Sequence, residues 1–168
     1  MRLQYQIEQT LLWIFVILSA LVIGGGLYEM CVMVPLWASS PPDSAWYWET
    51  QRLSFPQYAP NAGIRFWIYL TPLHFIVSIA TLIVGWKTAG WHRTWLAIST
   101  IIFIVMHLSA FLWFAPVATQ IMNSRSLGIS PERVVARTHL WVRLSWARFV
   151  IEFVGFLCGL RALQVRPV

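Results

Sequence analysis

Residues His139 to Gly159 read HLWVRLSWARFVIEFVGFLCG, an apolar segment of membrane-spanning length that contains Arg143, Arg148 and Glu152. A charged side chain near the centre of a bilayer costs roughly 3 kcal/mol on insertion scales, so it is retained mainly where it faces protein, water or a ligand. The rest of the chain must therefore provide an interior that surrounds these charged groups.

Helical spacing divides this segment into two faces. At 100° per residue, the side chains along one side of the helix are mostly polar or small. This stripe consists of Trp141, Ser145, Arg148, Glu152, Gly155 and Gly159. Apolar residues cover most of the remaining surface, namely Phe149, Val150, Phe153, Val154 and Leu157. The pattern predicts a helix with one face against other helices and one against lipid. Because Arg148 and Glu152 lie one turn apart, we expect them to form an ion pair.

The composition indicates an integral membrane protein. Of 168 residues, 58% are hydrophobic and 11% charged, and the mean hydropathy of +0.65 lies outside the range of soluble domains. Four apolar segments, at about 11–37, 64–86, 93–121 and 135–163, are each long enough to cross a hydrocarbon core of about 30 Å as a helix. We expect an all-α fold in which residues 1–168 form one domain, a four-helix membrane bundle of antiparallel up-down topology.

The net charge of +6 is spread over the predicted helix ends without a basic run. This distribution favours contact with anionic lipid headgroups over nucleic acid. The lipid bilayer and a lipophilic small molecule are the expected partners, and a membrane protein partner or a homo-oligomer stays open. Basic residues are equally frequent on both sides of the membrane. We expect the protein in a bacterial inner membrane, and the charge density of the short turn and tails favours both termini in the cytoplasm.

The connections carry fewer functional signals. We expect residues 1–10 to be a short polar lead, Pro35 to help end the first helix, and His92 to be solvated in the turn at residues 87–93. Residues 38–63 form an aromatic-rich connection between the first and second spans, expected at headgroup level and possible as a short interfacial helix. Two roles stay open for this connection: a lid over a cavity and a membrane-anchoring loop.

Four ionisable side chains on four different predicted helices are candidates for catalysis: Glu29, His74, His107 and Arg148. The helical rise places all four near mid-membrane or in the half away from the termini. Imidazoles and a carboxylate can act as acid and base, and a guanidinium can bind an anionic or carbonyl oxygen. The structural alternatives are an ion pair of Arg148 with Glu152 or Glu29, and neutral imidazoles bonded to neighbouring hydroxyl or carbonyl groups.

The sequence predicts close helix packing next to Glu29. Gly25 or Gly26 lies on the same helical face as Glu29, so a neighbouring backbone can approach closely there.

Three uses of the histidines stay open. A metal could take His74, His107 and Glu29 as ligands, although no HxxxH or ExxH motif supports it. A haem could be held between His74 and His107, although no CxxCH motif is present. Alternatively, the histidines act without a cofactor, as acid and base for a lipophilic substrate that enters from the bilayer.

Three segments carry a resemblance to a known family. They are GGGLYEMCVMVPLW at residues 24–37, FLWFAPVATQIMN at residues 111–123, and WVRLSWARFVIEFVGFLCGLRAL at residues 141–163. With them the chain resembles the anthrone-oxygenase-like family of small four-helix membrane proteins. The most specific element is the spacing from Trp141 to Arg148 together with Pro116 and Asn123. Family members often carry Asn or His where this chain has Ser145.

The resemblance implies an oxidoreductase that oxidises a fused aromatic hydroxy-ketone to a quinone with molecular oxygen and without a redox cofactor. His74 or His107 would be the base and Arg148 the anion stabiliser. The expected substrate-binding residues are Trp67, Trp141, Ser145, Phe111, Asn123 and Tyr28. Two other functions stay open: a non-catalytic subunit or assembly factor of a larger membrane complex, and a haem or metal electron carrier that uses His74 and His107.

Overall fold

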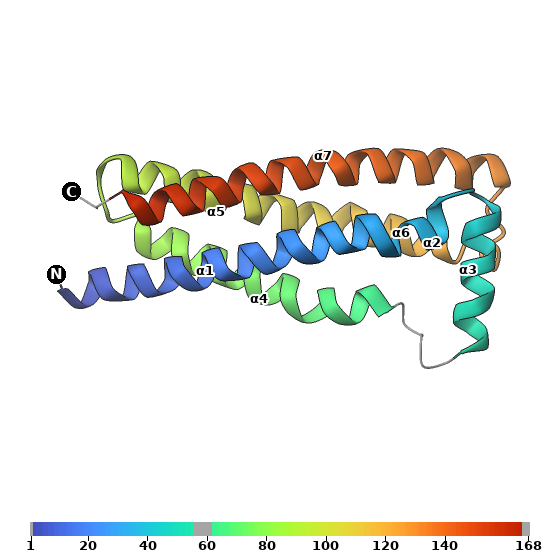
Figure 1. Ribbon diagram of the computed structural model, residues 1–168, viewed down its shortest axis with the longest axis horizontal. Helices are drawn as coiled ribbons and strands as arrows, with labels where there is room; N and C mark the ends of the chain where they lie inside the picture. The colour runs from blue at the N-terminus through green and yellow to red at the C-terminus, as the bar shows by residue number, and fades with distance from the viewer. Residues whose placement is uncertain (1, 56–61, 166–168) are drawn as a thin grey trace. The chain divides into compact units, whose positions relative to one another are not determined.

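The computed structural model describes residues 2–55 and 62–165, and every secondary-structure element in these residues is helical (Figure 1). In chain order the elements are α1 (Arg2–Tyr28), η1 (Glu29–Met33), α2 (Pro35–Ala38), α3 (Asp43–Ser54), α4 (Ala62–Gly85), α5 (Gly90–Ser109), η3 (Ala110–Phe114), α6 (Ala115–Met122) and α7 (Pro131–Gln164). The two η elements are π-helical turns. The all-α prediction is confirmed for the described residues.

The chain forms two compact units. Unit 1 contains residues 1–24, 69–108 and 149–168, and unit 2 contains residues 25–68 and 109–148. Helices α1, α4 and α7 each contribute to both units.

Three helical segments in the described part of the chain are long and apolar enough to cross a membrane: Gln4–Ala38, Ile64–Gly85 and Gly90–Met122. They agree with the first three predicted spans and are consistent with an integral membrane protein. The fourth predicted span, in α7, does not meet the same criterion. Charged side chains occur along the whole length of this helix, from Arg133 to Arg161.

The first span differs from the expectation at both ends. Helix α1 already begins at Arg2, so residues 2–10 are not a separate polar lead. At the other end Pro35 does not end the helix, because η1 and then α2 continue it to Ala38. The Val34 N–H bonds to the Glu29 carbonyl five residues back, at 2.8 Å, and Pro35 sits in the first turn of α2, where its missing N–H needs no partner.

The connection between the first two spans is largely helical. Helix α3 includes the aromatic residues at 46–48, whereas Tyr58 lies outside the described residues. Glu49 of α3 is buried, and its carboxylate accepts the backbone N–H groups of Arg125 and Ser126 at 3.0 Å each. This carboxylate fixes α3 to the turn between α6 and α7.

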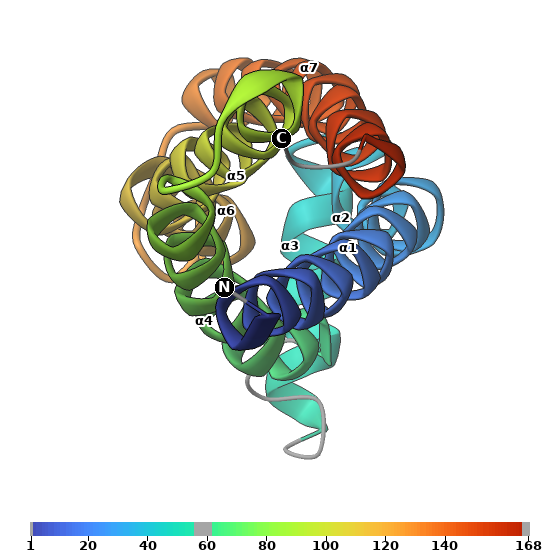
Figure 2. The same cartoon turned by 90° about the vertical axis from the view of Figure 1, so that its left-hand side faces the viewer.

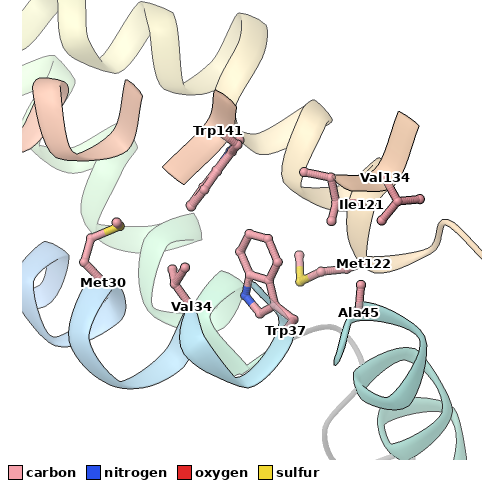
Figure 3. Close-up of a cluster of buried hydrophobic side chains, with 8 residues drawn as sticks. All are labelled: Met30, Val34, Trp37, Ala45, Ile121, Met122, Val134 and Trp141. Atoms are coloured by element: carbon pink, nitrogen blue, oxygen red, sulfur yellow. The ribbon is translucent and has the colours of Figure 1, made fainter. Parts of the chain in front are cut away.

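The core of unit 2 is a cluster of large apolar side chains (Figure 3). It consists of Met30, Val34, Trp37, Ala45, Ile121, Met122, Val134 and Trp141. The Trp37 and Trp141 rings meet edge to face, with centroids 5.1 Å apart. Helices α2, α3, α6 and α7 are joined here by apolar packing.

The core of unit 1 combines apolar and polar side chains. The N-terminal end of α1, the turn between α4 and α5 and the C-terminal end of α7 lie at the same end of this unit (Figure 1, Figure 2). Leu12, Phe15, Leu96 and Phe103 are fully buried in it. Buried hydroxyl groups and histidines lie among them: Ser19, Thr71, His74, Ser78, Thr81, His92, Ser99, Thr100 and His107.

Helix α7 has the two faces that its sequence predicts. Trp141, Ser145 and Glu152 are buried, whereas Val150 and Leu157 are exposed. The helix begins at Pro131, directly after Ser130. Hydrogen bonds to its own backbone N–H and to the Ser130 side chain lower the pKa of the exposed Glu132 carboxyl.

Close helix packing in unit 1 can be tested at a glycine. A Cβ at the buried Gly155 would lie 2.8 Å from Ile102 Cγ2, whereas one at Gly24 would meet nothing within 4 Å. Alanine at either position gains the same helix propensity, so we expect Gly155→Ala to be less stable than Gly24→Ala by about 1–3 kcal/mol, the usual effect of overpacking. Unfolding in one detergent measures the difference. Equal stabilities would contradict close packing at Gly155.

Candidate functional site

Unit 2 brings together parts of the three segments on which the family resemblance rests. Trp141 Nε1 donates a hydrogen bond to the Phe114 carbonyl at 2.9 Å. The guanidinium carbon of Arg148 lies 5.1 Å from the centroid of the Phe114 ring, a cation–π contact. Trp37, at the end of the first segment, packs on Trp141. At least one residue of each segment therefore lies in this group of side chains, namely Trp37, Phe114, Trp141 and Arg148.

Glu29 is held by a neighbouring helix within the same unit. Trp67 Nε1 of α4 donates a hydrogen bond to the Glu29 carboxylate at 2.5 Å. Gly25, one turn earlier, faces α4 as well, since a Cβ there would lie 2.6 Å from the ring of Phe66. The Phe66 ring, rather than the expected neighbouring backbone, thus packs against this face, and Trp67 orients the carboxylate. Arg148 is near enough for its charge to act on Glu29.

Both π-helical turns contribute to this site. Glu29 opens η1, and Phe114 ends η3. A π turn contains an extra residue, so it rotates the side chains that follow relative to an unbroken α-helix, and such turns are frequent at functional sites. Phe111, one of the expected substrate-binding residues, lies inside η3 and is 44% exposed.

Ser145 is an unusual polar residue in this unit. It is buried, and its Oγ has no hydrogen-bond partner among the residues that the structure describes. On α7 it lies one turn after Trp141 and one turn before Arg148. A buried hydroxyl without a partner is unfavourable unless a ligand or water satisfies it. The site thus combines a carboxylate, a guanidinium and an available hydroxyl with aromatic rings.

Two of the expected substrate-binding residues, Tyr28 and Asn123, have surroundings that do not themselves indicate a bound substrate. Tyr28 is 59% exposed. Asn123, at the end of α6, accepts a hydrogen bond from Arg52 of α3 and donates one to the Thr119 carbonyl at 2.8 Å. It therefore connects α3 to α6, and its role in substrate binding stays a prediction. A nearby open pocket of about 400 Å³ is lined by Glu49, Thr50, Leu53, Ser54, Arg125 and Ser126.

Unit 1 brings the two candidate histidines together. His107 Nε2 and His74 Nδ1 are 3.0 Å apart, and His74 Nε2 lies 3.0 Å from Ser19 Oγ. The Ser19 hydroxyl donates to the Phe15 carbonyl at 2.8 Å, so it accepts from His74 Nε2–H. A neutral His74 then accepts from His107 Nε2–H at its Nδ1. The two imidazoles and the hydroxyl form a continuous, directed hydrogen-bonded chain.

This geometry bears on the cofactor alternatives. Metal–nitrogen bonds of about 2.0–2.1 Å place two ligands on opposite sides of a metal about 4 Å apart, whereas the ring nitrogens of His74 and His107 are 3.0 Å apart. The direct hydrogen bond therefore leaves no room for a haem iron between the rings. Among the described residues, no group of three or more His, Cys, Asp or Glu side chains is arranged to hold a metal.

The four candidate catalytic residues fall into two groups. Glu29 and Arg148 belong to unit 2, and His74 and His107 belong to unit 1. Glu152 is buried, and its predicted ion pair with Arg148 stays a prediction.

Sequence reasoning missed a second polar centre in unit 1. Glu8 and His92 are each 1% exposed, and His92 Nε2 lies 2.6 Å from Glu8 Oε1. The expectation that His92 is a solvated turn residue is wrong, because α5 begins two residues before it. A signal for both positions was present in the sequence. Glu8 precedes Leu12 by one turn on the buried face of α1, and His92 precedes Leu96 in the same way on α5.

Comparison with known proteins adds no assignment to this geometry. No protein-family model, no curated protein and no solved structure matches the chain. The likeness to the anthrone-oxygenase-like family therefore rests on the three sequence segments alone. A function has to be argued from the residues of the two units.

Stability should depend on the pairing of Glu8 with His92. His92→Ala leaves a carboxylate buried without its partner, so we expect a loss of about 3–5 kcal/mol of unfolding free energy. The double variant Glu8→Leu/His92→Leu removes both polar groups and should recover most of that loss. His139→Ala, at an exposed histidine, is the control. Denaturant unfolding in one detergent compares the four proteins. A double variant no more stable than His92→Ala would show that packing, rather than the charge pair, stabilises this region.

Proposed function

We propose that the protein is an oxygenase-like membrane oxidoreductase that acts on a lipophilic aromatic hydroxy-ketone or quinol-type substrate at the site of unit 2. The observation that supports this proposal best is the meeting of the three family-like segments around Phe114 and Trp141, in the unit that also holds Glu29, Arg148 and Ser145. A carboxylate, a guanidinium and an unpartnered buried hydroxyl lie there among aromatic side chains.

Each of these groups has a role in the proposed reaction. The Glu29 carboxylate, oriented by Trp67, takes the acidic carbon-bound proton from the substrate. Arg148 and Ser145 hold the oxygen on which the negative charge of the enolate develops. Molecular oxygen then converts the methylene carbon to a carbonyl: one oxygen atom enters the product, and the other leaves with the two hydrogens as water. Phe114 and Trp141 offer faces and edges for a fused ring system.

This assignment moves the base from the histidines to Glu29. The reason is that Glu29 and Arg148 belong to one compact unit and are close enough for their charges to interact. Proton removal and stabilisation of the resulting anion must take place on one substrate molecule, so the two groups that perform them need to lie side by side.

The proposal includes a specific membrane arrangement. Helix α7 crosses the bilayer as a fourth span and completes an antiparallel up-down four-helix bundle. Its 34 residues are more than long enough, and the two charged groups in its middle, Arg148 and Glu152, lie on one face. The bundle lies in a bacterial inner membrane with both termini in the cytoplasm.

Activity of substituted proteins tests the proposed roles. With a hydroxyanthrone as substrate, Arg148→Leu should lower kcat about 10²–10³-fold, because the developing anion loses its cation. Glu29→Gln should lower it about 10²–10⁴-fold, because the base is lost. Arg143→Leu and Glu132→Gln remove exposed charges of the same helix and should leave kcat unchanged. Oxygen uptake and quinone absorbance measure the turnover. A wild-type protein that neither binds nor oxidises such compounds would refute the proposal and favour a non-catalytic subunit.

Ligand binding gives a separate test at Ser145. Ser145→Ala removes the unpartnered hydroxyl, so the free protein should be as stable as the wild type or more stable. Its affinity for a hydroxyanthraquinone should fall by about 1 kcal/mol, because one hydrogen bond to the ligand is lost. Ser124 is the matched control, since its hydroxyl is also buried without a described partner but lies in the turn after α6. Quenching of tryptophan fluorescence reports binding. Equal affinities of both variants and the wild type would exclude a ligand contact at Ser145.

A further inference from the structure

The open pocket beside α3, called here the α3 pocket, lies wholly within unit 2. Its two walls are the C-terminal half of α3 and the turn between α6 and α7. The backbone N–H groups of Arg125 and Ser126 bond to the Glu49 carboxylate and so hold the two walls together. Its volume of about 400 Å³ lies within the range of small-molecule sites.

The α3 pocket lies where the chain leaves its membrane-spanning segments. The span Gln4–Ala38 ends shortly before α3 begins, and the span Gly90–Met122 ends directly before the turn. Ala45 of α3 and Met122 belong to one buried cluster, so these two ends meet in unit 2 (Figure 3). Tyr47 and Leu53 of α3 are 65% and 67% exposed, as is common in helices at a membrane surface. The pocket is therefore expected at the level of the lipid headgroups.

The Arg125 side chain brings a positive charge to this pocket. Its guanidinium makes no hydrogen bond or ion pair with any residue among 2–55 and 62–165, although its backbone N–H is bonded to Glu49. A guanidinium carries five N–H donors in a planar fork that matches the oxygen atoms of a phosphate group. Arg125 can therefore bind a phosphate in the pocket.

The hydroxyl groups of the pocket provide hydrogen-bond acceptors. The hydroxyls of Thr50, Ser54 and Ser126 each donate to a backbone carbonyl of their own helix or turn, at 2.9, 2.9 and 3.0 Å. Because a hydroxyl has one hydrogen and two lone pairs, each oxygen can still accept a hydrogen bond from a ligand. The Glu49 carboxylate adds a negative charge beside these acceptors. An ammonium group, which is positive and only donates, fits this half of the pocket.

We propose that the α3 pocket binds the headgroup of phosphatidylethanolamine, a lipid that carries both a phosphate and a primary ammonium group. Arg125 donates to the phosphate oxygens, and the hydroxyls of Thr50, Ser54 and Ser126 accept from the ammonium. Phosphatidylcholine offers the same phosphate, but its quaternary ammonium has no N–H to donate. Phosphatidylglycerol has no cationic group at all. The pocket should therefore select phosphatidylethanolamine over both.

Native mass spectrometry of the full-length protein in detergent tests this selection. Phosphatidylethanolamine, phosphatidylcholine and phosphatidylglycerol with identical acyl chains are added in turn, without any aromatic substrate, so the outcome does not depend on the proposed reaction. The first lipid should bind about 10-fold more tightly than the other two, the difference that one charge-assisted hydrogen bond makes. Water-soluble glycerophosphoethanolamine carries the same two groups without acyl chains. If it bound as tightly as the lipid, the assignment to a membrane lipid would be wrong.

Substitutions at the pocket separate its two halves. Arg125→Gln should weaken the binding of phosphatidylethanolamine and phosphatidylcholine alike, by about 10-fold, because both lose the phosphate contact. Thr50→Val/Ser54→Ala should weaken only phosphatidylethanolamine and so abolish its advantage over phosphatidylcholine. Arg133→Gln, at an exposed arginine of α7 that does not line the pocket, is the matched control and should bind as the wild type does.

The substituted side chains are all exposed, so the fold should persist, and circular dichroism checks its helix content in each variant. A preference for phosphatidylethanolamine that survives in Thr50→Val/Ser54→Ala would overturn the proposal. Equal weakening in Arg133→Gln and Arg125→Gln would overturn it as well, because the lipid would then respond to the charge of the surface and not to the pocket.

Discussion

The fold depends on one constraint: a polar group in a lipid environment has to find its partner within the protein. Unsatisfied groups there cost several kcal/mol each, so polar faces of helices associate with polar faces. Glu29 meets Trp67, and Glu8 meets His92, in contacts of 2.5 and 2.6 Å. These contacts help to determine how α1 is rotated in each unit. Apolar packing then fills the space around them, but leucine and phenylalanine side chains alone would allow several rotations.

Helical periodicity predicts which face of each helix is buried. The stripe through Trp141, Ser145 and Glu152 is buried as expected, and the face of α4 that carries His74 is buried as well. The same reasoning could have identified Glu8, had the first helix been extended toward the N-terminus. It was missed because a charged residue near the start of a chain is usually solvated. The partner of a buried charge lies on another helix, and one sequence does not reveal it.

Contacts between helices could be predicted less well than the buried face of each helix. Depth along a helix follows from counting residues, so similar depths were expected for Glu29, His74, His107 and Arg148. Their division into two compact units was not predicted, because counting along each helix separately does not show which stretches of the different helices pack together. The π turns likewise could not be predicted from the sequence. A single inserted residue is favourable only in its tertiary surroundings, and nothing local in AFLWF distinguishes it from an α-helix.

The π turn η1 also shows where the length of this chain can change. A π turn accommodates one additional residue within a helix. A deletion of one residue between Glu29 and Met33 that restored an ordinary α-helix would therefore leave Trp37 close to its present direction, against Trp141. A residue added to the helix without such a turn would instead rotate Trp37 by about 100°. Related sequences should therefore differ by one residue at this turn more readily than elsewhere in the helix.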